Sequence, residues 1–180
     1  MSGAIFSYFL SIVATGTAIK LMDDYLDEPT NTDGQVIYAL LALSVGASLN
    51  PEAALSLFLA AYASGMISDL GRPLPLGLKG WQESLLVLSW GCYRFGWVQQ
   101  LGALAIIMGI QLYDDLADYP WDRIQGYPNF VTLWGYNEVI LSLAILLLTA
   151  ATIDPQKTLA SLLALPWALQ LASWERRTCS

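Results

Sequence analysis

The sequence predicts an all-α fold, a polytopic membrane helical bundle of about seven spans with an internal repeat. Hydrophobic residues make up 56% of the 180 residues and charged residues only 13%, whereas soluble domains carry about 25% charged residues. Apolar segments recur between short polar ones, and one acidic motif occurs twice. We therefore expect a single transmembrane helical domain over residues 1–180, with repeat-like halves at about 1–80 and 81–180.

Each apolar segment predicts one helix. The first segment is followed by charge at Lys20 and not preceded by it, so we expect a retained helix and not a signal peptide. Several later segments are shorter than the roughly 20 residues that cross a hydrocarbon core, and these are expected to use flanking residues or to stop short. In chain order the predicted spans cover residues 4–22, 35–49, 51–68, 83–95, 97–113, 129–153 and 155–173.

The basic residues predict the orientation of these spans. If successive spans alternate in direction, Arg94 and Lys157 lie on one side of the membrane and the other basic residues lie on the opposite side. Cytoplasmic loops carry the excess of Lys and Arg, so the second side is expected to be cytoplasmic. We therefore expect an integral protein of the plasma membrane with its N-terminus outside.

Charge and composition exclude several classes of function. The chain has 15 acidic and 8 basic residues, a net charge of -7 and no histidine. Nucleic acid is not an expected partner, because Lys and Arg supply the affinity for a phosphate backbone. The lack of histidine excludes Ser-His-Asp catalysis and His-ligated zinc or haem. Carboxylates, Lys, Arg, Tyr or a bound metal remain for any chemistry.

An internal repeat is the most informative feature of the sequence. The segment Ile19–Asp27, IKLMDDYLD, recurs 91 positions later as Ile110–Asp118, IQLYDDLAD, and each copy ends an apolar span. Four predicted spans separate the copies, and an even number of crossings returns the chain to the same face. Both copies are therefore expected at the cytoplasmic face, where they would contribute to one site between the repeat halves.

The acidic residues of each copy stand at positions i, i+1 and i+4, which crowds like charges on a helix. Such crowding at a membrane surface is costly unless carboxylates are protonated or a cation neutralises them. Mg²⁺ takes oxygen ligands and often shares its octahedron between carboxylates and substrate phosphates. We therefore expect Mg²⁺ ions that hold a diphosphate, with solvated helix ends as the alternative. The first acidic cluster is Asp23, Asp24 and Asp27, and the second is Asp114, Asp115 and Asp118.

The second copy and its surroundings resemble the UbiA-type intramembrane prenyltransferases, which carry an N-D-x-x-D-x-x-x-D motif and a later D-x-x-D-x-x-x-D motif at the cytoplasmic mouth of a helical bundle. Residues 115–126, DLADYPWDRIQG, followed by VTLWG at 131–135, are similar to the family's second motif and its tail. Residues 75–82, PLGLKGWQ, leading to LSWG at 88–91, resemble a family loop that precedes an apolar helix. The resemblance covers about residues 15–137.

The chain departs from the family pattern at several positions. Asp23 and Asp114 stand where the family usually has Asn, and Asn31 stands where a further acid of the first motif is expected. Pro120 lies within the second motif and predicts an interruption of the helix before Asp122. The chain is also shorter than the family's usual nine helices.

The resemblance implies prenyl transfer. An isoprenyl diphosphate would be held by Mg²⁺ and ionised, and a hydrophobic or aromatic acceptor would attack the carbocation. By this resemblance Asp122 joins the metal ligands of the second cluster, and Asp115 and Asp118 also act in catalysis. Lys79 and Arg123 would contact the diphosphate, with ordinary flanking charge as the alternative for both.

Four further residues are expected to line the substrate pocket. Asn137 and Glu138 fall inside the predicted sixth span, where an unpaired carboxylate usually lines a cavity. Tyr25 and Tyr113 flank the acidic clusters and are placed to face a carbocation, with interfacial anchoring as the alternative.

Lys20 lies one turn before the first acidic cluster, where salt pairing at i,i+4 competes with a substrate contact.

Other functions remain open from the sequence. The same ionising residues without an acceptor would make a membrane terpene cyclase or an isoprenyl diphosphate lyase. Acidic residues on repeated helices also describe a divalent-cation transporter, although its carboxylates should lie near the middle of the membrane and these lie at helix ends. A non-catalytic membrane subunit is the last alternative, favoured by the short chain and the irregular first motif.

Overall fold

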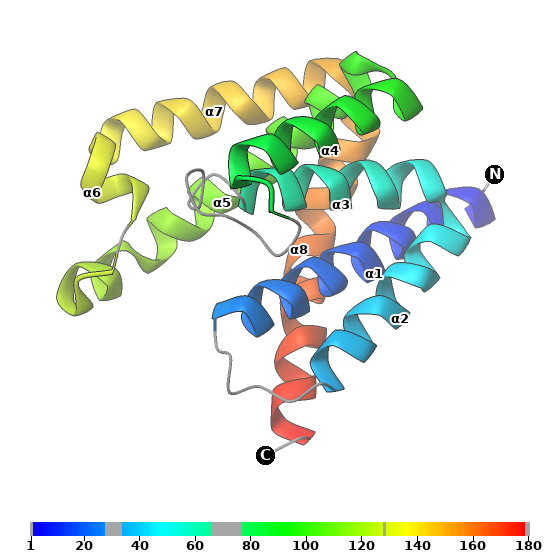
Figure 1. Cartoon of the computed structure of the whole chain (residues 1–180), viewed down its shortest axis with the longest axis horizontal. Coiled ribbons are helices and arrows are strands. Elements are labelled where there is room, and N and C mark those ends of the chain that lie inside the picture. The colour runs from blue at the N-terminus through cyan, green and yellow to red at the C-terminus, as the bar shows by residue number, and fades with distance from the viewer. Residues whose placement is uncertain (1, 28–33, 66–76, 128, 179–180) are drawn as a thin grey trace. The chain divides into compact units, whose positions relative to one another are not determined.

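The computed structural model describes residues 2–27, 34–65, 77–127 and 129–178, and in these ranges the chain forms eight α-helices (Figure 1). The all-α class predicted from the sequence is confirmed. The helices are α1 (Ser2–Asp27), α2 (Gly34–Leu49), α3 (Pro51–Gly65), α4 (Gly80–Phe95), α5 (Trp97–Gln125), α6 (Phe130–Trp134), α7 (Tyr136–Ile153) and α8 (Pro155–Thr178).

Two glycines with positive φ separate consecutive helices. Gly96, at φ +88°, lies between α4 and α5, and Gly135, at φ +102°, lies between α6 and α7. Glycine adopts this backbone conformation without steric cost. The predicted single span over residues 129–153 is therefore wrong, because Gly135 divides it into a short α6 and a longer α7. Within the described residues, each of the other predicted segments falls on one helix.

The chain forms two compact units. Unit 1 comprises Met1–Leu59 and Leu159–Ser180, and unit 2 comprises Ala60–Thr158. These bounds differ from the predicted repeat halves, because most of α8 belongs with the N-terminal helices. Each unit carries one copy of the acidic repeat, on α1 in unit 1 and on α5 in unit 2.

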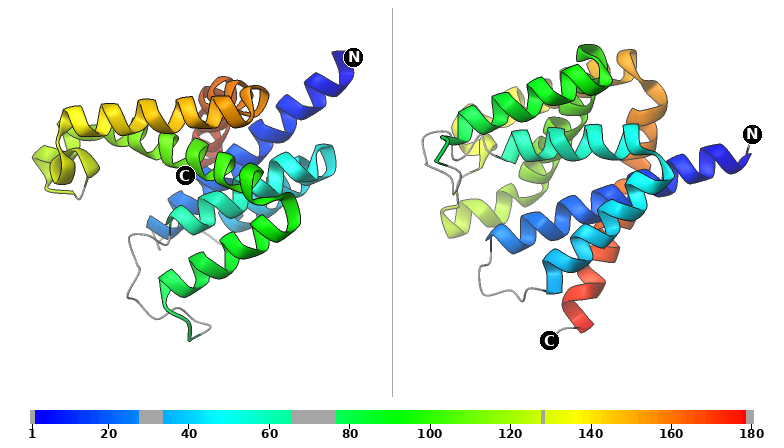
Figure 2. Two further views of the ribbon diagram at one scale, coloured as in Figure 1. Left: turned by 90° about the horizontal axis from the view of Figure 1, so that it is seen from above. Right: turned by 45° about the vertical axis from the view of Figure 1, so that its right-hand side comes forward.

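In unit 1, α1 and α2 pack side by side in opposite directions (Figure 2). Ser11 Oγ donates a hydrogen bond to the Gly46 carbonyl at 2.7 Å. Leu21 of α1, Ala39 of α2 and Ala172 of α8 form a buried core cluster. Small residues at these contacts allow the helix backbones to approach closely, as they do between membrane helices.

In unit 2, α7 lies alongside α5 and runs in the opposite direction (Figure 2). A Cβ on Gly102 would lie 2.9 Å from Ile153 Cγ2, and a Cβ on Gly109 would lie 3.0 Å from Leu147 Cδ2. The two glycines, seven residues apart, therefore provide the surface on which α7 packs. The core cluster that joins α5, α6 and α7 consists of Leu112, Val131 and Val139.

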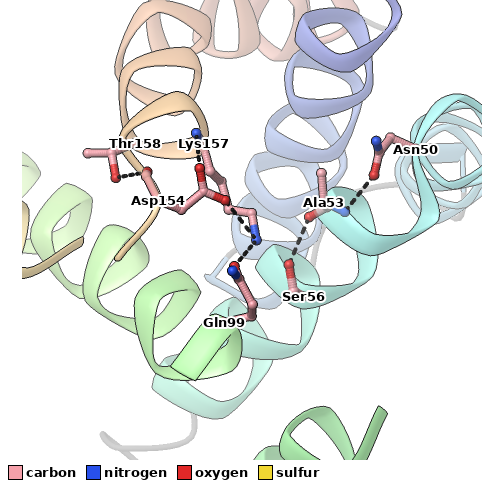
Figure 3. Close-up of polar contacts among 7 residues, drawn as sticks. All are labelled: Asn50, Ala53, Ser56, Gln99, Asp154, Lys157 and Thr158. Atoms are coloured by element: carbon pink, nitrogen blue, oxygen red, sulfur yellow. Dashed lines mark hydrogen bonds and ion pairs between the residues drawn. The ribbon is translucent and has the colours of Figure 1, made fainter. Parts of the chain in front are cut away.

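A buried lysine forms a polar cluster where α7 is followed by α8 (Figure 3). Lys157 is 3% exposed, and its Nζ lies 3.9 Å from Asp154 Oδ2 and 3.5 Å from Gln99 Oε1. Asp154 Oδ1 accepts a hydrogen bond from the Lys157 N–H at 2.8 Å, and the Asp154 carbonyl accepts one from Thr158 Oγ1 at 2.9 Å. A buried charge needs such partners, so we assign Lys157 a structural role at the start of α8.

Two of the described helices are long and apolar enough to cross a membrane, Gly3–Leu26 within α1 and Tyr136–Ile153, which is α7. A core helix of a soluble protein or an N-terminal signal sequence has the same length and composition. Helices α2, α3 and α4 have 16, 15 and 16 residues, fewer than the roughly 20 that a full crossing requires. The structure therefore does not show a bundle of seven spans.

Candidate functional site

The second acidic motif lies at the C-terminal end of α5. The predicted interruption at Pro120 is wrong, because α5 continues through this residue as one helix. The helix ends at Gly126, whose left-handed backbone at φ +75° places its N–H 2.8 Å from the Asp122 carbonyl. Asp115, Asp118 and Asp122 therefore occupy positions i, i+3 and i+7 of a single helix, which share one face.

Asn129 joins the two ends of this motif. It is only 2% exposed, and its Nδ2 donates to the Asp115 carbonyl at 2.8 Å and to Asp122 Oδ2 at 2.7 Å. Its Oδ1 accepts from the Val131 N–H at 2.8 Å, which caps the start of α6. One buried amide thus connects two positions of α5, seven residues apart, with the next helix.

The Asp115 carboxylate is partly buried beside the same turn. Its Oδ2 accepts a hydrogen bond from the Phe130 N–H at 2.7 Å. Burial raises the pKa of Asp115 above its ordinary value; the Phe130 hydrogen bond opposes this rise, and the charges of Asp122 and Asp118 add to it. Negative charge is therefore disfavoured at Asp115, and a cation beside these carboxylates would relieve the cost.

The remaining acid and the predicted basic residues of unit 2 are exposed. Asp118 and Arg123 lie on the surface of the last turns of α5. Lys79 stands at the N-cap of α4, where its backbone N–H donates to Gln82 Oε1 at 2.9 Å. Within the described ranges neither Lys79 nor Arg123 forms an ion pair.

The first acidic cluster lies at the C-terminal end of α1. Lys20 Nζ is 3.2 Å from both Asp23 Oδ2 and Asp24 Oδ1, so the salt pairing at i,i+4, one of the two alternatives for this lysine, is present. The Asp23 side chain is 59% exposed, whereas that of Asp24 is 11% exposed. Asp27 is the last residue of α1, and its side chain lies outside the described part of the structure, as does Asn31.

The predicted pocket residues lie near helix ends. Asn137 and Glu138 are exposed in the first turn of α7, and not deep within a span as predicted, because α7 begins after Gly135. Tyr25 is partly buried near the end of α1, and Tyr113 is exposed on α5. A substrate pocket formed by these residues stays a prediction.

Metal binding by the acidic clusters also stays a prediction. The two clusters belong to different units, and in the part of the chain that the structure describes no group of three or more His, Cys, Asp or Glu side chains is placed to hold a metal ion. Mg²⁺ commonly takes one or two carboxylates and completes its shell with water and substrate phosphates. Asp115 and Asp122 supply hard oxygen donors of the kind that Mg²⁺ prefers.

Sequence reasoning missed Asn129. Asn129 is 14 residues from Asp115 and 7 residues from Asp122 in the sequence. No periodic pattern of residues predicts a contact between a loop amide and a helix at such separations. One available signal was its place directly before the apolar stretch that forms α6, since Asn is a preferred N-cap residue. That signal indicates a helix start but not the link to the acids.

The resemblance to the UbiA-type prenyltransferases rests on the two acidic motifs and on the stretch that contains Lys79. The second acidic motif is described in the structure from Asp115 to Gly126, whereas residues 75 and 76 of the stretch that contains Lys79 lie outside the described residues. Comparisons of the chain with protein-family models, with curated proteins and with solved structures found no match in any of the three.

Proposed function

We propose that the chain is a Mg²⁺-dependent membrane prenyltransferase, which transfers an isoprenyl group from an isoprenyl diphosphate to a lipid-soluble or aromatic acceptor. The observation that carries this proposal is the second acidic motif. Asp115, Asp118 and Asp122 share a face of one continuous helix. Hydrogen bonds from residues 129 and 130 fix the orientation of the Asp122 and Asp115 carboxylates. The sequence resemblance to the UbiA-type family supplies the substrate class.

The proposed reaction requires stabilisation of charge on a leaving diphosphate. Bound Mg²⁺ would supply Lewis-acid stabilisation of the diphosphate oxygens, and Asp115, Asp118 and Asp122 would hold it. Arg123 offers a planar pair of donors and Lys79 a compact charge for the same oxygens. When the C–O bond breaks, its electron pair leaves with the diphosphate. The acceptor then forms the new bond to the allylic carbon and releases a proton to solvent.

We further propose that the chain is an integral protein of the plasma membrane, a bundle of about seven spans with the acidic motifs at the cytoplasmic face and the N-terminus outside. Helix α7 supports a membrane location, because only 11% of its apolar window is buried within the protein. An apolar helix with so much exposed surface is suited to contact with lipid. The excess of basic residues on one side supports the orientation.

Purified protein in lipid vesicles, incubated with labelled isoprenyl diphosphates and Mg²⁺, tests this function. With a lipid extract as the source of acceptor, we expect a labelled lipid product that is absent when excess EDTA is present. Full turnover in EDTA would contradict the metal requirement. Labelled hydrocarbon formed without the extract would indicate a cyclase or lyase, and uptake of a divalent cation without diphosphate release would indicate a transporter. If neither reaction nor uptake is observed, the non-catalytic membrane subunit is the remaining alternative.

Two substitutions test the assignment of the acids. Asp115→Ala is expected to abolish turnover, an effect on the order of several kcal/mol, because it removes a ligand of the ion that stabilises the leaving diphosphate. Asp23→Asn is expected to be mild, because the Asp23 side chain is 59% exposed. Both variants would be assayed after normal insertion has been verified. An equal loss in both would contradict the residue assignment.

A further inference from the structure

We propose that Asn129 is a positioning residue, which holds the carboxylates of Asp115 and Asp122 in the arrangement that binds a metal-diphosphate ligand. This inference rests on the proposed function, because it assigns a role within the same site. Asn129 itself would touch neither the metal nor the diphosphate. It would act through the two acids that its segment orients.

The hydrogen bonds of Asn129 leave its amide a single orientation. Both amide hydrogens are directed to α5, one to the Asp115 carbonyl at 2.8 Å and one to Asp122 Oδ2 at 2.7 Å. The amide oxygen accepts from the Val131 N–H at 2.8 Å. A flipped amide would turn its oxygen toward the Asp122 carboxylate and lose all three bonds. The bond to Asp122 is also charge-assisted, which makes it stronger than a neutral one.

Each acid is fixed through one carboxylate oxygen. Asp122 Oδ2 is bound by Asn129, and Asp115 Oδ2 is bound by the backbone N–H of the next residue, Phe130. Within the described part of the chain, the structure gives the other oxygen of each carboxylate no protein partner. The segment 129–130 therefore sets the direction of both acids and leaves one oxygen of each for a ligand.

The position of Pro120 explains why α5 needs this support. Proline lacks the N–H that would bond to the carbonyl four residues earlier, and its ring crowds that carbonyl. The weakened turn lies between Asp115 and Asp122, so the helix alone does not fix their separation firmly. Asn129 bridges the weak turn from outside, because it contacts the backbone on one side of Pro120 and a side chain on the other.

Substitution of Asn129 by Asp separates this role from helix capping. Aspartate keeps the size of the side chain and the oxygen that accepts from Val131, but it loses both donors and places a second negative charge beside Asp122. Asn50→Asp is the matched control. Asn50 caps α3 through its Oδ1, which accepts from the Ala53 N–H at 2.9 Å (Figure 3). This control changes the charge equally, and within the described residues no acidic side chain is bonded to Asn50.

The ligand probe is Mn²⁺ with inorganic pyrophosphate, measured by electron paramagnetic resonance on the full chain in lipid vesicles. We expect Asn129→Asp to weaken binding about tenfold or more and to change the spectrum of the ion at saturation, because the two acids no longer keep their directions. The control is expected to stay within about twofold of wild type with an unchanged spectrum. A role in folding alone would lower the melting temperature but would not alter the spectrum of the bound ion.

Asn129→Ser provides a second variant if the aspartate variant does not fold. Serine also caps helices but is too short to donate to both acids, so it is expected to weaken binding and to change the spectrum in the same way. Wild-type affinity and spectrum in a folded variant at this position would overturn the inference and leave the proposed function standing. An equal loss in Asn50→Asp would also overturn it. If wild type itself bound no Mn²⁺-pyrophosphate, the proposed function would fail, and the inference with it.

Discussion

Asp115 occupies surroundings that oppose its own charge. Burial raises its pKa, and the charges of Asp122 and Asp118 add to this effect, while only the hydrogen bond from Phe130 favours the ionised form. A bound cation would offset this unfavourable charge. The stability of the metal-free protein and its affinity for the ligand would therefore both depend on the Asp115 carboxylate.

Asp115→Asn separates stability from affinity, because the amide keeps an oxygen for the Phe130 N–H and removes the charge. Without metal, we expect the variant to melt at a higher temperature than wild type at neutral pH. The raised pKa means that the folded state binds the proton more tightly. Wild-type stability should therefore fall as pH rises from the ordinary Asp pKa through the raised value, and the variant should show a smaller fall.

Thermal unfolding with and without Mg²⁺ and pyrophosphate measures both effects. The ligand is expected to raise the melting temperature of wild type but not that of Asp115→Asn. Asp118→Asn removes a charge that only adds to the cost at Asp115, and its own side chain is exposed, so it is expected to raise the metal-free melting temperature less than Asp115→Asn does. A lower melting temperature for metal-free Asp115→Asn would contradict the argument from burial.

At the scale of helices, the contact between α1 and α2 depends on the absence of a side chain at Gly46. A Cβ at this position would lie 2.6 Å from Thr15 Oγ1 and 3.0 Å from the Ser11 carbonyl oxygen. The carbonyl belongs to the backbone of α1 and cannot rotate away. An added methyl group would therefore push the two helices apart.

Gly46→Ala is expected to destabilise the protein by about 1–3 kcal/mol, the usual cost of overpacking. Gly3→Ala is the matched control, because a Cβ on Gly3 meets nothing within 4 Å. In a helix this second change should be neutral or stabilising by up to about 1 kcal/mol. Circular dichroism melts of both variants provide the measurement. Equal stability of the two variants would show that the close approach at Gly46 contributes nothing.

The positions of the helices were predictable from the sequence, but two features of the C-terminal part of unit 2 were not. Apolar segments predicted helices because apolar side chains must be covered, and α2 and α4 follow these segments closely. The break at Gly135 was missed because the apolar pattern continues across it. Continuation of α5 through Pro120 was missed because proline usually interrupts a helix, and the contacts that Asn129 makes on both sides of this turn come from beyond the helix.

At the scale of the whole molecule, the membrane location can be tested directly. Expressed protein is expected to sediment with membranes and to stay there after extraction with alkaline carbonate, because α7 exposes most of its apolar surface. A peripheral protein would be released by the same treatment and provides the control. Release of this chain into the soluble fraction would contradict a spanning location and the proposed use of a membrane acceptor.

Helices from the N-terminal and C-terminal parts of the chain pack together in unit 1, and this affects the order in which the two units are completed during synthesis. Ala39 and Ala172 share one core cluster although 133 residues separate them. At about 5–20 residues per second, a ribosome needs about 7–27 s to add that stretch. Unit 2 is contiguous from Ala60 to Thr158, so all of it has been synthesised before most of α8. The cluster of Leu21, Ala39 and Ala172 can therefore form only after α8 has been synthesised, so unit 1 is completed after unit 2.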